Sequence, residues 1–531
     1  MRSTGGADGG EARAILASAM SASSAMSASS KVNRRAFLAS ALGAAAAPAA
    51  AQTGRDRPNV LFLSVDDMND WVGCLGGYPG VKTPNIDRLA QRGALFRDAH
   101  CSSPLCNPSR TALLTGLRPD TTGIYGNSEY WRPVLPDVTT LPMFFRENGY
   151  HAAGAGKVFH HTAGFNPPDQ WDEFQLQEFD DPWYRRTEWY PWVKKIPNPP
   201  GHPFNGMAGD DFAGEFDWGA LPNRPEQTYG DMAAVRFGRD FLAKKHDKPF
   251  FLAIGLWHPH IPMFAPQEYF DLYPPESVRL PEVPGNDLDD LPPVAQEFAA
   301  ARRDEHERIV REGKWKDGVR AYLACISFAD HMVGMVLDAL AASRHADNTV
   351  IVLWSDHGWH LGEKRHWHKG TLWQRATHVP MIWAGPGVER TGVARAQPVE
   401  LLDMYPTLAE LCGLEAPRAL EGVSLVPQLR DPSAPRRPAV CTYQANNHAV
   451  ITPQWRYIRY RDGAEELYDR QKDPNEWTNL AGRPEHAELK RELAVFMPRF
   501  SARPQPTREA YDFDMDSYTY RLKSGRSKPG G

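Results

Sequence analysis

Three continuous apolar runs constrain the fold of this chain more than any other feature. They cover residues 60–64, 250–254 and 350–354. A strand that is apolar at every position is buried on both faces, as parallel strands are when helices cover both sides of a sheet. Between these runs, residues 86–93 and 318–342 carry apolar side chains at the three- and four-residue spacing of helices. The alternation predicts an α/β fold with a large sheet sandwiched by helices.

The length of the chain allows more than one domain. It has 531 residues, of which 42% are hydrophobic and 11% aromatic, enough to bury a large core. Proline-rich residues 431–438 predict a linker, and the patterns at 439–443 and 457–460 predict strands of a smaller unit beyond it. We therefore expect a larger domain over residues 55–430 and a smaller C-terminal α+β subdomain over residues 431–531. The net charge of -5 is close to neutral and argues against a nucleic-acid partner, for which a basic face is typical.

The first 51 residues have the composition of a disordered leader and an export signal. Residues 33–38 read Asn-Arg-Arg-Ala-Phe-Leu, which is typical of a twin-arginine signal, and an alanine-dominated stretch covers 36–47. Small residues at 49–51 offer a cleavage site. The alternatives are an ordinary secretory signal and a weak membrane anchor, and an alanine run is too weakly apolar for the second. We expect handling by the twin-arginine export machinery of a bacterium, a periplasmic or secreted location, and no stable membrane insertion.

Acidic residues stand at the ends of two of the three apolar runs. Asp66 and Asp67 follow the first run, and Asp356 with His357 follows the third. In an open α/β sheet, functional groups gather beyond the carboxyl ends of the strands, so these side chains are expected to meet. Carboxylate oxygens suit Ca²⁺ or Mg²⁺ rather than a thiophilic metal. For either pair taken alone, a turn or a helix cap is the alternative role.

The most specific motif of the chain is Cys106-Asn107-Pro108-Ser109-Arg110. Pro108 suits the first turn of a helix, because its missing N–H would be unpaired there in any case. Cys106 would then lie at a helix N-terminus, where the helix dipole favours a bound anion. The alternative is a free cysteine beside a helix start. The six cysteines of the chain match no zinc-binding template.

With these motifs the chain resembles the type I sulfatases of the alkaline phosphatase superfamily, and most closely their iduronate-2-sulfatase branch. The resemblance implies an alkaline phosphatase-like fold, with a mixed and mostly parallel sheet. It also implies hydrolysis of a sulfate ester, expected on a sulfated carbohydrate. Besides the cysteine motif, the resemblance is carried by residues 84–90, 118–122, 156–160, 259–262, 355–359, 378–380, 466–469 and 473–476.

The resemblance implies a complete active site. Cys106 would be oxidised to Cα-formylglycine by a formylglycine-generating enzyme, and the hydrated aldehyde would be the nucleophile. One divalent cation, Ca²⁺ rather than Mg²⁺, would be bound by Asp66, Asp67, Cys106, Asp356 and His357. The catalytic residues implied in this way are Cys106, Arg110, Lys157, His160, His260 and Lys369.

The same resemblance assigns a role to each catalytic side chain. One hydroxyl of the hydrate would attack sulfur and release the alcohol; deprotonation of the other would then expel sulfate and restore the aldehyde. His160 is the expected base for this second step, and Arg110 is expected to stabilise the hydrate. His260 and Lys369 are expected to hold the sulfate, and one of them protonates the departing alcohol, which is a poor leaving group without a general acid.

Two further groups of side chains have competing interpretations. Trp131 and Trp359 are candidates for stacking on a sugar ring, and a place in the core is the equal alternative. The histidines at 360, 366 and 368 lie close enough together to suggest zinc, but the resemblance assigns none of the three to a metal.

Two other functions stay open from the sequence. The first is hydrolysis of a phosphonate monoester or phosphodiester, since phosphate and sulfate esters are similar in shape and differ in charge. The second is a non-catalytic protein that binds sulfated glycans. Such a protein would be expected to have lost catalytic positions, whereas every expected position is filled here.

Overall fold

The computed structural model describes residues 57–177, 191, 201–209, 212, 214–221 and 230–523. The leader, the twin-arginine signal and the cleavage site predicted above lie outside the described residues.

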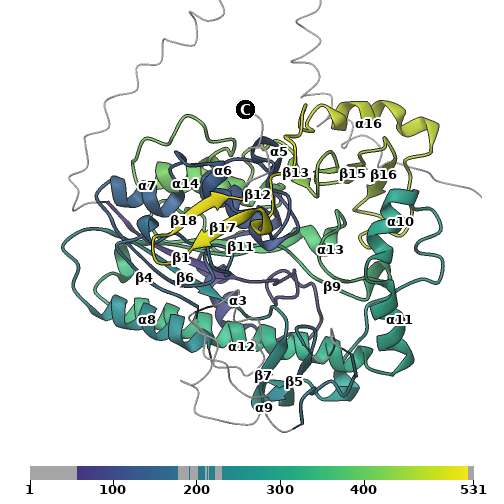
Figure 1. Ribbon diagram of the computed structural model, residues 1–531, viewed down its shortest axis with the longest axis horizontal. Helices are drawn as coiled ribbons and strands as arrows, with labels where there is room; N and C mark the ends of the chain where they lie inside the picture. Colours follow the sequence, from purple (N-terminus) through teal and green to yellow (C-terminus); the bar gives the residue numbers. More distant parts are fainter. Residues whose placement is uncertain are drawn as a thin grey trace, which may run out of the picture. The chain divides into compact units, whose positions relative to one another are not determined.

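An eight-stranded sheet forms the centre of the structure (Figure 1). In spatial order its strands are β12 (Val399–Glu400), β2 (Ala94–His100), β11 (His378–Ala384), β8 (Thr349–Ser355), β1 (Asn59–Val65), β6 (Phe250–Leu256), β3 (His151–Gly156) and β4 (Glu173–Gln175). β1 pairs in parallel with β6 on one side and with β8 on the other. β11 is antiparallel to both of its neighbours, β2 and β8. The sheet is therefore mixed and mostly parallel, as predicted.

The central strand β1 shows why the apolar runs are continuous. Leu61 and Leu63 belong to the hydrophobic core on one face of the sheet, whereas Val60 and Phe62 belong to the core on the other face. Each of the four side chains is buried. Because successive side chains of a strand point to opposite faces, burial on both faces requires an apolar residue at every position.

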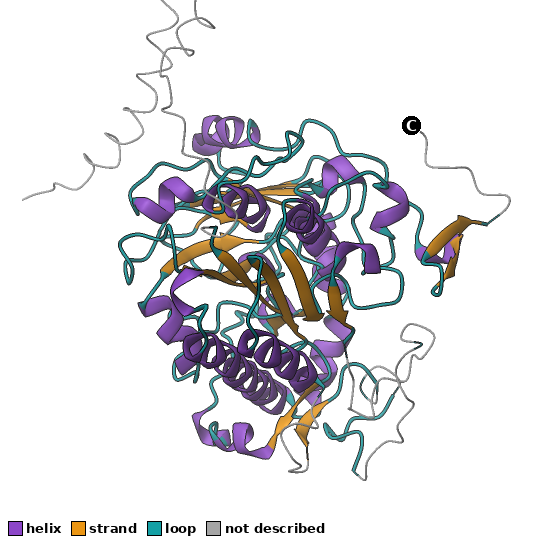
Figure 2. Cartoon of the chain, turned by 90° about the vertical axis from the view of Figure 1, so that its left-hand side faces the viewer, coloured by secondary structure: helices purple, strands orange, loops and turns teal. Residues whose placement is uncertain are grey.

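Helices cover both faces of the sheet (Figure 2). Each group of helices contributes to one of the two hydrophobic cores. One core includes residues of α3 (Pro84–Gln91), α8 (Asp231–Ala243) and α12 (Trp315–Ala342). The other includes residues of α4 (Cys106–Thr115), α7 (Leu141–Glu147) and α14 (Met404–Leu411). Further helices are α5 (Pro119–Thr122), α6 (Trp131–Val134), α9 (Gln267–Asp271), α10 (Pro293–Ala300), α11 (Arg303–Arg311), α13 (Gln374–Thr377) and α15 (Val426–Arg430).

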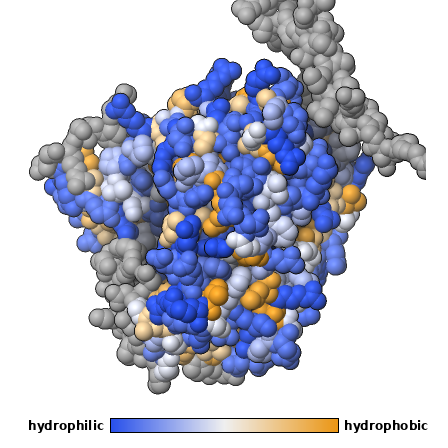
Figure 3. Space-filling model, turned by 90° about the vertical axis from the view of Figure 1, so that its right-hand side faces the viewer, coloured by the Kyte–Doolittle hydropathy of each residue, from blue (hydrophilic) through white to orange (hydrophobic). Residues whose placement is uncertain are grey.

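The helical predictions are confirmed, since 86–93 corresponds to α3 and 318–342 to α12. Within the described ranges, α12 is the one helix long and apolar enough to cross a membrane. Most of its apolar stretch is buried inside the protein, however, and its side chains belong to the hydrophobic core. This is the environment of a core helix. The outer face in Figure 3 is mainly hydrophilic, with small scattered apolar areas.

Beyond the main sheet, the C-terminal part has a sheet of its own. Its four strands are antiparallel and run in chain order: β13 (Ala439–Thr442), β14 (His448–Ile451), β15 (Trp455–Arg459) and β16 (Glu465–Asp469). The strand predictions at 439–443 and 457–460 are confirmed, and so is the predicted fold class. The domain limits at 55–430 and 431–531 stay a prediction. Smaller elements are α16 (Ala487–Ala494), the pair β5 (Trp218–Leu221) with β7 (Met263–Pro266), the pair β9 (His360–Leu361) with β10 (Trp367–His368), and the hairpin β17 (Tyr511–Asp514) with β18 (Thr519–Leu522).

Candidate active site

The carboxyl ends of two parallel neighbours, β1 and β8, place four polar side chains together. Asp66 and Asp67 follow β1 directly, and Asp356 and His357 follow β8. Because the two strands are paired in register, their ends lie side by side. The backbone N–H of Asp67 donates to Asp356 Oδ1 at 3.1 Å. All four side chains are buried, so the predicted convergence of the strand ends is found in the structure.

Helix α4 brings the cysteine motif to the same place. Cys106 is the first residue of the helix, and Pro108 lies in its first turn, as predicted. Ser109 Oγ donates to the backbone carbonyl of Asp356 at 2.6 Å, which ties the helix to the end of β8. Every residue of α4 is buried. The motif is therefore a rigid part of the core whose first residue faces the strand ends.

Five side chains form a cluster that could hold a metal ion. Among the described residues, one group of possible ligands was found, and its ligand atoms all lie within 4.8 Å of one another. His357 Nδ1 lies 3.0 Å from the carbonyl of Gly358, which can only accept, so Nδ1 carries the proton and Nε2 is left for a cation. Asp67 Oδ2 is buried and has no hydrogen-bond partner among the described residues. The donor set fits a hard divalent cation. Its members are Asp66, Asp67, Cys106, Asp356 and His357.

Arg110 holds the two strand ends in place. Its Nε donates to Asp356 Oδ2 at 2.9 Å and its Nη2 to Asp66 Oδ1 at 3.0 Å. Nη1 donates to the carbonyls of Lys157 and Val158 at 2.5 and 3.0 Å. The guanidinium is completely buried and has donors in a rigid fork, so it fixes both carboxylates and the residues that follow β3.

The buried carboxylates of the cluster raise one another's pKa values. Burial raises the pKa of Asp66 and raises the pKa of Asp67 to about 8. Burial also acts to raise the pKa of Asp356, but the charge of Arg110 outweighs it and holds this pKa well below its usual range. Burial lowers the pKa of His357, so its ring is neutral and able to ligate. Carboxylates crowded in this way repel one another, and a divalent cation would remove that repulsion.

Two lysines flank the cysteine. Lys157 Nζ lies 3.7 Å from Cys106 Sγ and forms a buried ion pair with Asp66. Lys369 Nζ lies 3.1 Å from Cys106 Sγ and 2.6 Å from Asp67 Oδ1. Burial acts to lower the pKa of Lys369, but the neighbouring Asp67 outweighs it, so this pKa lies above its usual value. An anion next to residue 106 would therefore meet two ammonium groups.

His260 also faces the cluster, in a defined tautomer. Its Nε2 lies 3.7 Å from Asp67 Oδ2. Its Nδ1 lies 2.6 Å from the carbonyl of Ile261, which can only accept a hydrogen bond, so Nδ1 carries the proton. Burial lowers the pKa of His260 well below its usual value, helped by the charge of Lys157. The neutral ring thus presents an unprotonated Nε2 to the site.

His160 is placed less directly than the other predicted residues. It follows Lys157 by three positions, and its ring contacts those of His161 and Phe165 at centroid distances of 4.5 and 4.9 Å. Burial lowers its pKa well below the usual value. The hydrogen bonds and ion pairs found among the described residues include none between His160 and Cys106. Its role as a base stays a prediction.

The two tryptophans differ in their surroundings. Trp131 is completely buried, its indole N–H donates to the carbonyl of Phe165 at 2.7 Å, and its ring stacks on Phe159. These are the contacts of a core residue, the alternative given above. Trp359 is buried beside the site, with its ring centroid 5.3 Å from Lys369 Nζ. Contact between Trp359 and a substrate stays a prediction.

The three histidines that suggested zinc have separate partners. Nε2 of His360 pairs with Thr371 Oγ1 at 2.8 Å, Nε2 of His366 with the Lys369 carbonyl at 3.1 Å, and Nε2 of His368 with Glu305 at 3.0 Å. None belongs to the metal-binding group found in the described part of the chain. Their positions fit a structural role.

Sequence reasoning missed two side chains that support the site. Trp257 follows β6, a neighbour of β1, and its ring lies 4.4 Å below Lys157 Nζ. The strand-end rule that found the acidic residues would have found it, had it been applied to an aromatic residue. Tyr322 of α12 donates to the carbonyl of Asp67 at 2.6 Å and accepts from the N–H of Asn69 at 2.9 Å. Nothing in its local sequence distinguishes Tyr322 from other core tyrosines.

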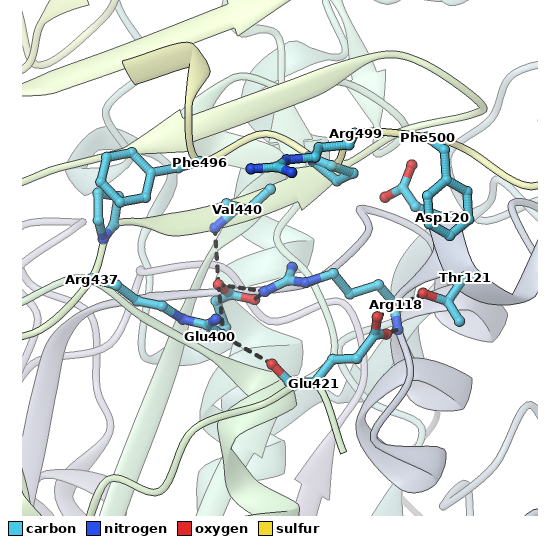
Figure 4. Close-up of a pocket in the computed structure, with 12 residues that line it drawn as sticks. Arg118, Asp120, Thr121, Glu400, Glu421, Arg437, Val440, Phe496, Arg499 and Phe500 are labelled. Carbon is cyan, nitrogen blue, oxygen red and sulfur yellow. Dashed lines mark hydrogen bonds and ion pairs between the residues drawn. The ribbon is translucent and has the colours of Figure 1, made fainter. Parts of the chain in front are cut away.

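A cavity of about 360 Å³ lies away from these residues and is shown in Figure 4. Glu400 stands between Arg118 and Arg437, at 2.6 and 3.8 Å. Glu421 accepts from the backbone N–H of Arg118. The charges at this cavity are therefore largely paired with one another, and none of the residues that line it belongs to the candidate active site.

The fold and the cluster at the strand ends define a hydrolase with an alkaline phosphatase-like fold. Within that class the chain belongs to the sulfatase family: residues 58–414 match the model of the Sulfatase family. Residues 362–502 match the C-terminal region of N-sulphoglucosamine sulphohydrolase. The protein is therefore a sulfuric ester hydrolase, and the resemblance seen in its sequence is confirmed.

Known proteins show how far this similarity extends. A sulfatase of Formosa agariphila is 40% identical over 472 residues, which cover 84% of this chain and 87% of that protein. Iduronate 2-sulfatase of Homo sapiens is 32% identical over 460 residues, which cover 76% of this chain and 81% of that protein. The crystal structure of phosphonate monoester hydrolase of Agrobacterium radiobacter is 22% identical, covers 83% of this chain and 94% of its own, and superposes with a TM-score of 0.65. At that identity it supports the fold alone.

Proposed function

We propose that this sulfatase hydrolyses a sulfate ester on a sulfated carbohydrate, using a Cα-formylglycine at position 106 and one divalent cation. The observation that carries the proposal is the convergence on Cys106. Possible metal ligands from β1 and β8 lie on one side of it, and Lys157 and Lys369 flank it. A thiol needs no such surroundings, whereas a developing anion does.

Asp66, Asp67, Asp356, His357 and residue 106 would hold the cation. Bound there, the cation would polarise a sulfate oxygen and favour the ionised form of the aldehyde hydrate. We propose Ca²⁺ rather than Mg²⁺. Three carboxylates can supply the larger number of oxygen ligands that Ca²⁺ accepts, and Mg²⁺ keeps several of its waters.

The two lysines and His260 are proposed to bind the sulfate group and to transfer protons. Lys157 and Lys369 donate to the sulfate oxygens, because both ammonium groups lie close to Sγ of Cys106. Lys369 is the proposed general acid. Its proton is available at neutral pH, whereas the Nε2 of neutral His260 carries none. His260 accepts a hydrogen bond or a proton at the same site.

The proposed substrate class follows from the relatives. The human relative is an iduronate 2-sulfatase, which supports a sulfated uronic acid or a similar sulfated sugar as the substrate. The sequence of residues 33–38 supports export by the twin-arginine route to the periplasm or the medium. Because that route carries folded proteins, a formylglycine-generating enzyme in the cytoplasm would act on Cys106 before export.

Mass spectrometry of the tryptic peptide 98–110 tests the nucleophile. The peptide also contains Cys101, so alkylation before digestion provides an internal reference: Cys101 gains the alkyl group. We expect an aldehyde at position 106 in active protein from a host that supplies the maturation enzyme. Cys106→Ala should be inactive and Cys101→Ala active. An alkylated Cys106 in fully active protein would refute the formylglycine mechanism.

A further inference from the structure

The segment that carries Lys369 has a strained backbone. Within residues 362–370, three non-glycine residues have a positive φ: Lys364 at 57°, Arg365 at 51° and His368 at 71°. These values lie in the left-handed region, where a non-glycine side chain is uncommon. Such strain persists where the surroundings hold it, and it is concentrated at functional sites. Because His368 directly precedes Lys369, the groups that hold His368 also set the starting point of the Lys369 side chain.

Two aromatic rings and one carboxylate hold the side chain of His368. Its ring centroid lies 4.2 Å from that of Phe216 and 4.8 Å from that of Trp359. Its Nε2 lies 3.0 Å from Oε2 of Glu305, the third residue of α11. Only 7% of His368 is exposed. The imidazole therefore has little freedom to turn.

The hydrogen bond between His368 and Glu305 has a defined direction. Burial acts to raise the pKa of Glu305, but the hydrogen bond from His368 and the charge of Arg302 outweigh it, so this pKa lies below its usual value. Burial lowers the pKa of His368 to about 4. At neutral pH the carboxylate is therefore ionised and the ring is neutral, and the Nε2–H of His368 donates to Glu305. A hydrogen bond to an ionised acceptor is stronger than one between neutral groups.

The next pair of residues makes a second contact between α11 and β10. His306 follows Glu305 in α11, and Trp367 precedes His368 in β10. The indole N–H of Trp367 donates to Nδ1 of His306 at 3.1 Å, and Trp367 is completely buried. Two successive residues of α11 thus hold two successive residues of β10, which fixes both the position and the direction of this short strand.

The segment fixed in this way places Lys369 beside the reacting atoms. Its Nζ lies 3.1 Å from Cys106 Sγ and 2.6 Å from Asp67 Oδ1. The same Nζ lies 5.3 Å from the ring centroid of Trp359, which also contacts His368. A lysine side chain is a flexible four-carbon stem, so the backbone from which it starts decides where the ammonium group lies. A misplacement of about 1 Å can lower a rate by about 10²-fold.

We propose that Glu305 and His368 are positioning residues, which hold Lys369 in the geometry for proton transfer to the departing alcohol. The inference rests on the proposed function, since it takes Lys369 to be the general acid. It adds α11 to the active site, although this helix lies outside every motif that carries the resemblance. A good leaving group needs less help from an acid, so the loss of positioning should depend on the substrate.

The first test compares Glu305→Ala with the wild type on two substrates. One is the best substrate in a panel of sulfated monosaccharides, whose alcohol is a poor leaving group, and the other is 4-nitrophenyl sulfate, whose phenol is acidic. We expect kcat for the sugar to fall about tenfold, and kcat for the aryl sulfate to fall about threefold or less. Glu305→Gln keeps an oxygen that accepts from His368, so it should retain most of the activity on the sugar. Rates are expressed per mole of formylglycine, measured in the peptide 98–110.

Glu307→Ala is the matched control. Glu307 is an exposed glutamate of the same helix, two positions beyond Glu305. Its removal should change neither rate by more than about twofold. A variant that merely loses stability would lower both rates equally, so the ratio of the two rates measures the positioning of Lys369.

Two substitutions at His368 test the strain. Both remove the contacts of the ring, but glycine adopts a positive φ at no steric cost and alanine does not. On the sugar, we therefore expect His368→Gly to keep about threefold more activity than His368→Ala. Equal activity of the two variants, or a more active His368→Ala, would overturn the role of the strained turn.

Lys369→Met separates this inference from the proposed function. If Lys369→Met lowers both rates equally, Lys369 is not the general acid, and the proposed proton transfer fails together with the inference. If Lys369→Met lowers the rate on the sugar selectively, whereas Glu305→Ala lowers both rates equally or neither, the inference alone fails.

Discussion

A buried ion pair of the C-terminal part, between Arg456 and Glu476, also hydrogen-bonds to the segment that leads from Lys369 into α13, and its removal should be costly. Arg456 of β15 is completely buried, and its Nε lies 2.5 Å from Glu476 Oε1. Its Nη1 donates to the carbonyl of Leu372 at 2.9 Å and to Thr377 Oγ1 at 3.0 Å. The perturbation is Arg456→Met, which keeps much of the volume and removes the charge.

The expected cost follows from what remains behind. Glu476 is only 2% exposed, so Arg456→Met leaves a buried carboxylate without its partner. Breaking a buried pair in this way costs about 3–5 kcal/mol, a large part of the ~5–15 kcal/mol of a typical domain. Glu476→Gln should cost a similar amount. The double variant leaves no unpaired charge, so it should cost no more than either single one, which corresponds to a coupling energy of at least about 3 kcal/mol.

The assay is urea unfolding of the four proteins of this cycle, followed by tryptophan fluorescence. Arg461→Met removes an exposed pair with Glu297 and is the matched control, with an expected loss of about 0–1 kcal/mol. Additive losses in the double variant would refute the reasoning, since they would show that the two side chains act independently. Activity should fall along with stability, because Arg456 also holds the loop that follows Lys369.

Three further results are expected. Chelation of divalent cations should abolish activity and lower the midpoint temperature of thermal unfolding. Adding Ca²⁺ at about 100 times its Kd should restore about 2.7 kcal/mol of stability. An unchanged midpoint temperature would contradict a metal site at Asp67. Lys369→Met should lower kcat/KM for a sugar sulfate by about 10²–10⁴-fold, and should lower it less for an aryl sulfate whose phenol is acidic. His260→Gln should lower kcat/KM for both substrates alike. The reverse pattern would make His260 the general acid. Burial raises the pKa of Asp70, but Arg375 outweighs it and lowers the pKa to about 2, below the unfolded value of 3.8. The stabilisation from Asp70 is thus present above pH 3.8 and is lost as the pH falls toward 2. The stability gap between wild type and Asp70→Asn should therefore shrink by about 2 kcal/mol in urea titrations across that window, and a constant gap would exclude the ion pair as its cause.

The strand-end part of the site could be predicted from local sequence. Continuous apolar runs identify buried parallel strands, and parallel strands in register bring their carboxyl ends together. Asp66 and Asp356 therefore meet although 290 positions separate them. The antiparallel direction of β11 has no such signal, because a strand buried on both faces is apolar whichever way it runs.

The residues on loops could be assigned only from the resemblance. Lys369 lies between β10 and α13, and His260 follows β6 in an irregular segment, so neither belongs to a periodic pattern. The sequence also does not show the surroundings of a buried side chain. Trp131 and Trp359 had the same two candidate roles, yet Trp131 is fixed in the core by Phe165, whereas Trp359 lies beside Lys369. Residue type gives the chemistry of a side chain, and only the fold gives its surroundings.

The burial of α4 limits when Cys106 can be modified. If Cys106 is converted to formylglycine as proposed, a maturation enzyme must bind the segment around it, yet all ten residues of the helix are buried once the core has closed. Conversion at Cys106 therefore has to be completed while the chain is still open, and it competes with folding, which in large proteins proceeds through intermediates. Molecules that fold before conversion would then stay inactive. The specific activity of a preparation would then record how the protein was synthesised, and no later treatment of the native protein would raise it.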